Sequence, residues 1–413
     1  MNARKFFVSQ AIISVAVNAA NALNIVFMLI TLRLPIEAFG EISSILAITF
    51  LFSLSQSSAR NQLLLIHKET GNLSESLSRT IQTVLPMAII TCITLACFSG
   101  VVARFLHFSG PLPFIIVSAC ALTYASNGIM QGVFATEKNS IHHAASLTIE
   151  SMCRIPLLFA FLANGYQTED VAWILLISGM TALTINICVL PRNVRKKLRS
   201  AHIRLRITED TWTALSILAS TILVGVALKI DILWSKHILS PESAGAYGMM
   251  NFVASVLFLG SSGIGRASLS FLGKENFRKT IIWSFGIMMA LCAACILGFY
   301  VVGLPVLHWI SSQGDGIDLQ IQLILFAAVA SYCIINFSFQ CLSVLHRSIH
   351  LPLSLGLVVS QLAGLMAYGT SMEKIAITQA LVMFVFAGAF SSMLLHKHKH
   401  VKKHVSHMHH SIA

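Results

Sequence analysis

The chain has 413 residues, of which 56% are hydrophobic and only 11% are charged, and its mean hydropathy is +0.78. This composition excludes a soluble globular domain and is typical of a polytopic membrane protein. The formal net charge of +12 would suggest a nucleic-acid partner in a soluble protein. The placement of the basic residues, described below, predicts membrane lipids as the partner and no nucleic acid.

Twelve apolar segments, separated by polar breaks and turn residues, are long enough to cross a hydrocarbon core of roughly 30 Å as helices. Six lie in the first half, at about 7–32, 41–65, 81–103, 112–135, 144–165 and 170–190. Six lie in the second half, at about 211–235, 244–268, 280–303, 318–345, 350–370 and 374–396. Because these runs are continuous and do not alternate, they exclude a barrel. The sequence therefore predicts an all-α polytopic membrane protein.

A short motif occurs twice, once before the second span and once before the eighth. Residues 34–42 read LPIEAFGEI and residues 239–247 read LSPESAGAY, so the leucine, the glutamate and the glycine match at an offset of 205. Six spans separate the two copies, which predicts parallel repeats about an axis along the membrane normal. We expect a six-helix lobe at 1–191, a basic cytoplasmic linker at 192–209, a six-helix lobe at 210–396 and a His/Lys-rich cytoplasmic tail at 397–413.

The basic residues fix the expected orientation. With the N-terminus inside, twenty of the 28 Lys and Arg residues fall in inner loops and tails, and four fall in outer loops. This bias predicts that both termini are cytoplasmic. It also explains the positive charge as an inner face that attracts anionic lipids.

No catalytic signature is present, and we predict that the chain is not an enzyme. It has no GxSxG, P-loop or HExxH motif, so transport by this chain would not be driven by its own ATPase. The nine cysteines all lie in apolar segments, where packing is their simplest role. We predict no metal site and no cofactor. The seven histidines between residues 396 and 410 are interpreted as a solvated basic tail, with transition-metal binding as the alternative.

Charged residues at membrane depth are costly and face a cavity or a partner. Glu150 and Arg154 are four residues apart on one helix face, so they either form a structural pair or line a cavity together. Lys229 and Asp231 are two apart near the outer end of the seventh span and point to different faces. They either line the same cavity or extend to the interface.

Two further pairs recur at related places in the two halves. Arg60 and Arg266 end the second and eighth spans, and they either reach inner-leaflet headgroups or frame a central cleft. Gln131 and Gln340 follow an asparagine by one helical turn in the fourth and tenth spans. Interhelical hydrogen bonding and contact with sugar hydroxyls are the two interpretations.

The repeated loop between two long spans resembles that of the multidrug/oligosaccharidyl-lipid/polysaccharide exporter superfamily. Within it, residues 239–247 are most similar to the loop of bacterial polysaccharide flippases of the O-antigen and capsule type, written GPEEFGxY. The first copy lacks the Pro-Glu order and the tyrosine.

The resemblance implies a V-shaped pair of lobes in the bacterial inner membrane, alternating access and a cationic cavity. It implies a flippase that moves undecaprenyl-diphosphate-linked oligosaccharide for O-antigen, lipopolysaccharide, capsule or exopolysaccharide synthesis. A polysaccharide polymerase and a chain-length regulator are the further partners implied. The main alternative is a multidrug or cation-coupled antiporter of the same fold. A membrane glycosyltransferase or polymerase would need a catalytic acid or base and a large outer loop, and every predicted outer loop is short.

The orientation can be tested with reporter fusions. We expect fusions after Arg206 and after residue 403 to read cytoplasmic, and fusions near Tyr166 and Asp315 to read periplasmic. A periplasmic reading at Arg206 would contradict both the span count and the parallel repeat.

Overall fold

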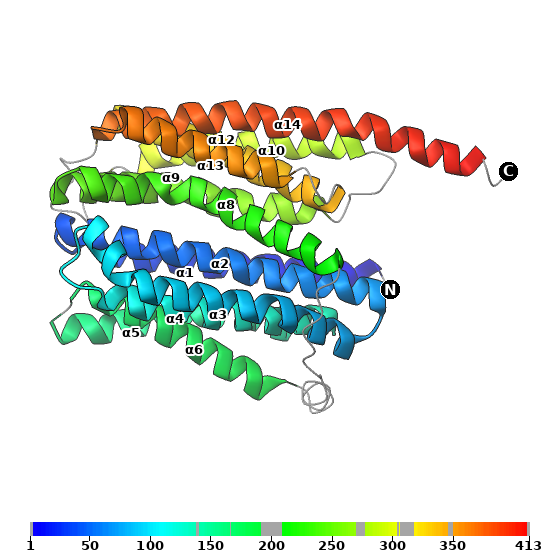
Figure 1. The fold of residues 1–413 in the computed structure, drawn as a ribbon, viewed down its shortest axis with the longest axis horizontal. Helices are drawn as coiled ribbons and strands as arrows, with labels where there is room; N and C mark the ends of the chain where they lie inside the picture. Colours follow the sequence, from blue (N-terminus) through cyan, green and yellow to red (C-terminus); the bar gives the residue numbers. More distant parts are fainter. Residues whose placement is uncertain are drawn as a thin grey trace. The chain divides into compact units, whose positions relative to one another are not determined.

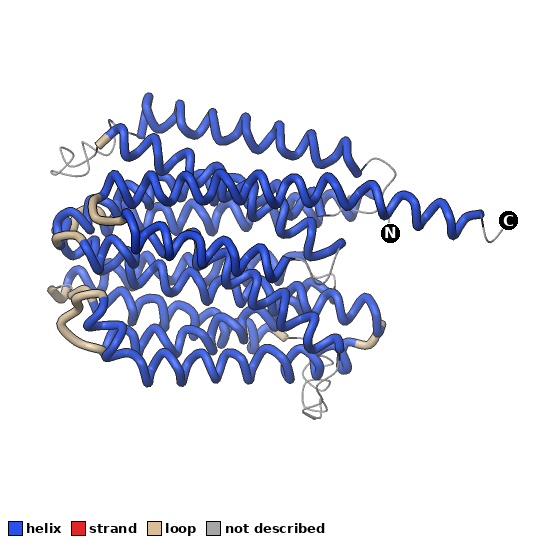
Figure 2. Tube along the Cα trace, turned by 45° about the horizontal axis from the view of Figure 1, so that its top comes forward, coloured by secondary structure: helices blue, strands red, loops and turns tan. Residues whose placement is uncertain are grey.

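The computed structural model describes the backbone of residues 3–137, 140–165, 167–190, 209–269, 277–303, 305, 318–345 and 350–410. Within these ranges the chain forms twelve α-helices and one π-helical turn, without a strand (Figure 2). By length and composition, ten of the described helices can cross a membrane. The prediction of an all-α, multi-pass membrane protein is confirmed.

Each predicted span corresponds to one helix. The first half contains α1 (Ala3–Thr31), α2 (Ile36–Thr70), α3 (Leu73–Phe105), α4 (Leu112–Thr136), α5 (Ser140–Ala163) and α6 (Glu169–Val189). The second half contains α8 (Glu209–Ile238), α9 (Pro241–Leu269), α10 (Phe277–Gly298), η1 (Phe299–Gly303), α12 (Leu319–Leu345), α13 (His350–Tyr368) and α14 (Met372–His410). Several helices exceed the predicted spans, because backbone hydrogen bonding continues into polar residues that hydropathy excludes.

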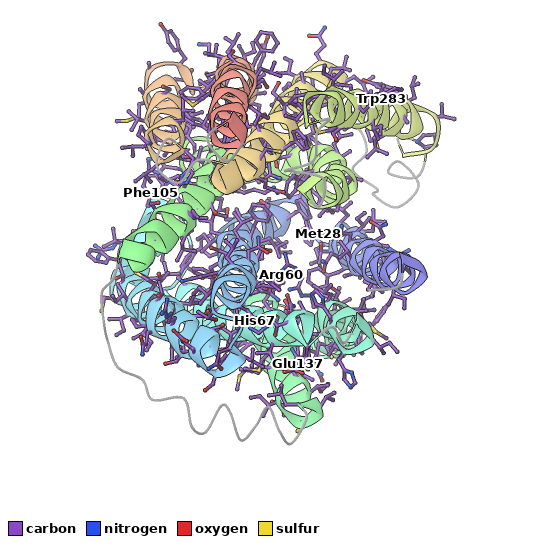
Figure 3. All side chains as sticks on the ribbon, turned by 90° about the vertical axis from the view of Figure 1, so that its right-hand side faces the viewer. Met28, Arg60, His67, Phe105, Glu137 and Trp283 are labelled. Carbon is purple, nitrogen blue, oxygen red and sulfur yellow. The ribbon has the colours of Figure 1, made fainter. Side chains whose placement is uncertain are left out.

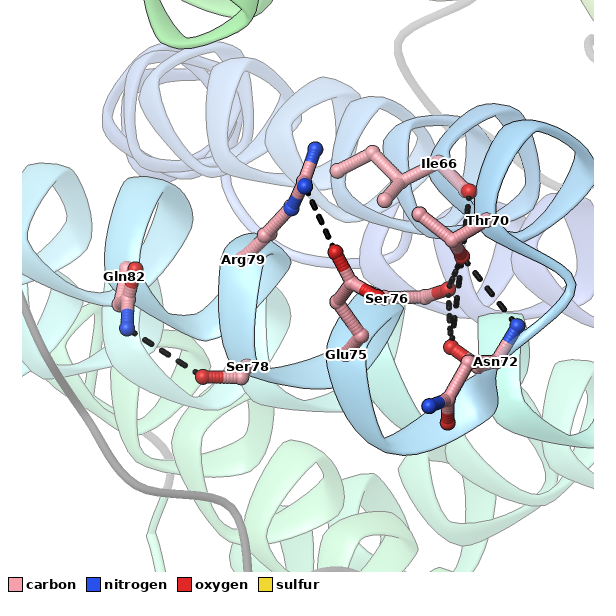
Figure 4. A network of polar contacts seen from close by, with 8 residues as sticks. All are labelled: Ile66, Thr70, Asn72, Glu75, Ser76, Ser78, Arg79 and Gln82. Carbon is pink, nitrogen blue, oxygen red and sulfur yellow. Dashed lines mark hydrogen bonds and ion pairs between the residues drawn. The ribbon is translucent and has the colours of Figure 1, made fainter. Parts of the chain in front are cut away.

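The corner between α2 and α3 shows how two helices continue past their apolar parts (Figure 4). Gly71 ends α2 in the left-handed conformation, with φ of 64°, and its N–H donates to the His67 carbonyl at 2.9 Å. The Asn72 side chain accepts from the Ser74 N–H at 3.0 Å and so caps α3. These bonds satisfy helix-end groups that would otherwise lack partners, so α3 begins at Leu73 instead of the predicted residue 81.

The chain divides into two compact units, Met1–Met249 and Met250–Ala413. In the first unit, α4 packs against α2, α3 and α6, and helices that are consecutive in the chain run in opposite directions (Figure 1). In the second unit, α14 packs against α12 and α13. Among the candidate spans, α4 and α12 are the most buried of their respective units. These two helices hold the same place, fourth, in the two sequence repeats.

The boundary between the two compact units differs from the predicted boundary between the lobes, because α8 belongs to the first unit. This helix packs along α2, and Gly225 makes the contact close, since a Cβ there would meet the side chains of Leu51 and Leu54. Consequently α8 and the first residues of α9 group with the first unit. The predicted linker lies almost entirely outside the described residues, and so do the side chains of the tail. The predicted lobe boundaries stay a prediction.

The repeated glycine of the loop motif has a structural reason. A Cβ placed on Gly40 would lie 3.1 Å from the backbone N of Gly245, and a Cβ on Gly245 would collide with the Ile36 carbonyl oxygen. Three residues further along, a Cβ on Gly248 would lie 3.0 Å from the Ser43 Cβ. Residues separated by 205 positions thus touch each other, so the two copies of the motif meet in the structure.

Substitution at Gly245 tests this contact. We expect Gly245→Ala to lower the melting temperature of the purified protein, because the added methyl meets backbone that cannot rotate away, at a cost of about 1–3 kcal/mol. Gly286→Ala in α10 is the matched control, since a Cβ there meets nothing within 4 Å. Equal melting temperatures for the two variants would contradict the close approach.

Candidate functional site

Arg154 is the centre of a buried polar network in the first unit. Its Nη1 donates to Asn24 Oδ1 of α1 at 2.8 Å, and its Nη2 donates to the Tyr124 hydroxyl of α4 at 2.7 Å. Nη2 also forms an ion pair with Glu150 Oε1, one turn earlier on α5. The guanidinium therefore joins three helices.

The network contains the ion pair that the four-residue spacing of Glu150 and Arg154 allows. Their side chains are only 9% and 12% exposed, so the pair lies in the interior of the unit. In the interior, the carboxylate and the guanidinium stabilise each other, because either one alone would be a buried, uncompensated charge. In the part of the chain that the structure describes, the buried Arg154 Nε has no hydrogen-bond partner. The guanidinium thus retains one donor that the network does not use.

Lys229 and Asp231 contact different helices, as their spacing predicts. The Lys229 Nζ lies 5.6 Å from the centroid of the Phe50 ring of α2, a cation–π distance. Asp231 is 0% exposed, and its Oδ2 accepts from the Tyr247 hydroxyl of α9 at 2.8 Å. Asp231 therefore does not extend to an interface; the hydroxyl of the repeated motif stabilises it inside the protein.

Arg60 lies among the helices of the first unit (Figure 3). It is 8% exposed, and its Nε and Nη2 lie 3.3 and 3.4 Å from the Asn61 Oδ1. Its backbone packs against Gly132 of α4, where a Cβ would lie 3.3 Å from the Arg60 carbonyl oxygen. The side chain of Arg266, its predicted counterpart, lies outside the described residues. Whether Arg60 and Arg266 frame a central cleft together therefore stays a prediction.

The amides of the fourth span take part in interhelical bonding. Asn127 of α4 donates to the Gly179 carbonyl at 3.0 Å and accepts from Asn186 of α6 at 3.0 Å. Gln131, one turn later, is 2% exposed, whereas Gln340 on α12 is half-buried. The asparagine thus has the structural role, and a role in substrate binding for either glutamine stays a prediction.

Sequence reasoning missed the neutral partners of the charges. Asn24, Tyr124, Tyr247 and Phe50 hold Arg154, Asp231 and Lys229, yet none of them was a candidate. A signal was present, since the chain has only six tyrosines and a buried tyrosine hydroxyl needs a hydrogen-bond partner. The spacing along the chain does not show which charged side chain each of these residues contacts.

Two polar clusters thus share the first unit without a common residue. One joins α1, α4 and α5 around Arg154, and the other joins α2, α8 and α9 around Lys229 and Asp231. Both clusters combine charged side chains with hydrogen-bonding or aromatic neighbours. Among the described residues, the structure holds no group of three or more His, Cys, Asp or Glu side chains arranged for a metal ion.

Comparison with solved structures identifies the class of fold. An outward-facing multidrug resistance MATE family transporter of the MOP superfamily matches with a TM-score of 0.67 and 13% identity, over 96% of each chain. An inward-facing MATE transporter matches with a TM-score of 0.63 and 11% identity, over 95% of this chain and 96% of that chain. A MOP superfamily transporter from Pyrococcus furiosus, described by the reverse polarity of its binding pocket, matches at 0.65 and 12%, over 95% and 96%.

A scan against protein-family models and a search of curated proteins find no match. At these identities the solved structures define the fold, which is that of MATE-type transporters of the MOP superfamily. The resemblance seen in the loop motif is therefore supported at the level of the fold alone. The polysaccharide flippase subtype has no such support.

The dependence of Arg154 on Glu150 can be measured. We expect Glu150→Gln to lower the free energy of unfolding by about 3–5 kcal/mol, because it leaves the guanidinium without its counter-charge. The double variant with Arg154→Gln should recover part of this loss. Chemical unfolding in detergent, followed by intrinsic fluorescence, is a suitable measurement.

The matched control is the Glu75–Arg79 pair of α3, which has the same four-residue spacing (Figure 4). Its side chains are 44% and 45% exposed, so Glu75→Gln should cost less than about 1 kcal/mol. If Glu150→Gln costs no more than Glu75→Gln, then Glu150 does not hold Arg154.

Proposed function

We propose that this protein is a secondary transporter, a multidrug or cation-coupled antiporter, that exports an amphipathic organic substrate. The observation that supports this is the likeness to MATE transporters over 95–97% of the chain, with nearly equal coverage of those proteins. The absence of an ATP-binding motif from the sequence agrees with coupling to an ion gradient.

Asp231 is our candidate for the coupling group. A carboxylate at membrane depth is a natural binding group for a proton or a metal cation. Asp231 is buried and is held by the Tyr247 hydroxyl of α9. Glu150 is less suitable, because its ion pair with Arg154 already engages it.

Transport in proteoliposomes tests this function. We expect imposed proton or sodium gradients to drive uptake of fluorescent organic cations, and Asp231→Asn to uncouple uptake from the gradient, because an amide carries no charge. Glu75→Gln is the control, since this residue is exposed and belongs to neither buried cluster. Gradient-independent uptake by the unchanged protein would contradict the proposal.

A second function, translocation of an undecaprenyl-diphosphate-linked oligosaccharide to the outer leaflet, is favoured by one observation. Arg154 retains an unused Nε donor in a buried polar network, and a guanidinium suits phosphate oxygens. Movement of a diphosphate and many hydroxyls through hydrocarbon is costly, and buried cations and amides would lower that cost. Lys229, Arg60, Gln131 and Gln340 would contribute on this interpretation.

The two functions predict different results for one variant. If the substrate is a lipid diphosphate, Arg154→Lys should reduce surface polysaccharide at least about tenfold, since the bidentate contact is lost, while cation uptake is unaffected. If the substrate is an organic cation, surface polysaccharide should not depend on this chain. Immunoblots for polysaccharide, normalised to inserted protein, distinguish the outcomes.

A further inference from the structure

Two histidines fasten the end of α8 to the corner between α3 and α4. His237, in the last turn of α8, donates from Nδ1 to the Phe105 carbonyl at 2.7 Å. His107, just beyond α3, donates from Nε2 to the His237 carbonyl at 3.0 Å. Both acceptors lie in the last turn of a helix, where carbonyls lack an intrahelical partner. The two helix ends therefore cap one another through imidazole rings.

The backbone of His107 adopts a conformation that disfavours side chains. Its φ is +56°, and it is the second residue after the end of α3. The Phe108 N–H donates to the Ala103 carbonyl at 2.9 Å and the His107 N–H to the Arg104 carbonyl at 3.3 Å, which is the Schellman arrangement.

Glycine is the usual residue at this position. The chain uses it at Gly71, which ends α2 with φ of 64° and where a Cβ meets nothing within 4 Å. A histidine in the same conformation at residue 107 therefore points to a role for its ring.

The contact around the two rings is extensive. The His237 ring stacks on Phe105 with centroids 3.9 Å apart and lies parallel to the His107 ring at 5.6 Å. The adjacent Lys236 has its Nζ 3.9 Å from Glu41 Oε1 of α2 and 5.6 Å from the Phe108 ring centroid. One turn of α8 is thus attached to both α2 and the α3–α4 corner.

We propose that His107 and His237 form a latch that holds the end of α8 against the first unit, and that the latch must open when α8 moves. By sequence, α8 is the first helix of the second repeat, whereas it packs with the first unit. It also carries Lys229 and Asp231, so its position sets the place of both charges. The consequence for turnover rests on the proposed transport function; the existence of the latch does not.

Hydrogen exchange of the full-length protein in lipid nanodiscs tests the latch without any substrate. His107→Gly keeps the left-handed cap and relieves its strain, but removes the ring. We expect amides at 235–239 to exchange about five times faster, the factor that corresponds to one lost hydrogen bond. If they exchange at the same rate or more slowly, His107 is only a helix cap and the proposal is wrong.

A second pair of variants separates the hydrogen bond from the stacking. In His237→Asn the amide nitrogen can take the place of Nδ1, so exchange at 103–108 should stay close to that of the unchanged protein. His237→Leu removes the donor and should accelerate it about fivefold. Equal rates in these two variants would also overturn the latch. Gly71→His, which places a ring where a Cβ meets nothing within 4 Å, should leave both segments unchanged.

If the protein transports substrate, His107→Gly should change the turnover rate and leave gradient coupling intact. A turnover rate equal to that of the unchanged protein would contradict the need for the latch to open. Failure of transport in every sample, including the unchanged protein, would count against the proposed function alone. The exchange result would then still decide whether the latch exists.

Discussion

The close approach of α2 and α9 is the constraint that fixes where α9 begins against the first unit. Gly40 and Gly245 meet backbone to backbone, and a side chain on the second would enter the Ile36 carbonyl. In a membrane, helices gain no hydrophobic energy from associating, so small residues that permit tight packing decide where they meet. The contact joins matching glycines of the two copies of the motif, and it holds the start of α9 against α2.

The sequence and the packing assign α8 to different parts of the protein. Its place in the sequence makes it the first helix of the second repeat, and its packing against α2 assigns it to the first unit. Gly225 permits the close contact along its length, and the reciprocal histidines hold its end.

The buried charges are each held by neutral neighbours. Arg154 has Tyr124 and Asn24 besides Glu150, Asp231 has Tyr247, and Lys229 lies over Phe50. Such partners lower the cost of charge at depth without cancelling it. By contrast, the Glu75–Arg79 pair is nearly half exposed, and such a surface pair contributes little to stability.

The sequence by itself determined the class of protein, the number and order of the helices, the repeated motif and the place of Glu150 and Arg154 on one helix face. These follow from local quantities: hydropathy over a span, the helical period, and a motif repeated at a fixed offset. Only the tertiary structure decided that Gly40 contacts Gly245, that the Tyr247 hydroxyl donates to Asp231, and that α8 packs with the first unit. Contacts between distant segments depend on how helices pack, and hydropathy is nearly the same for every packing.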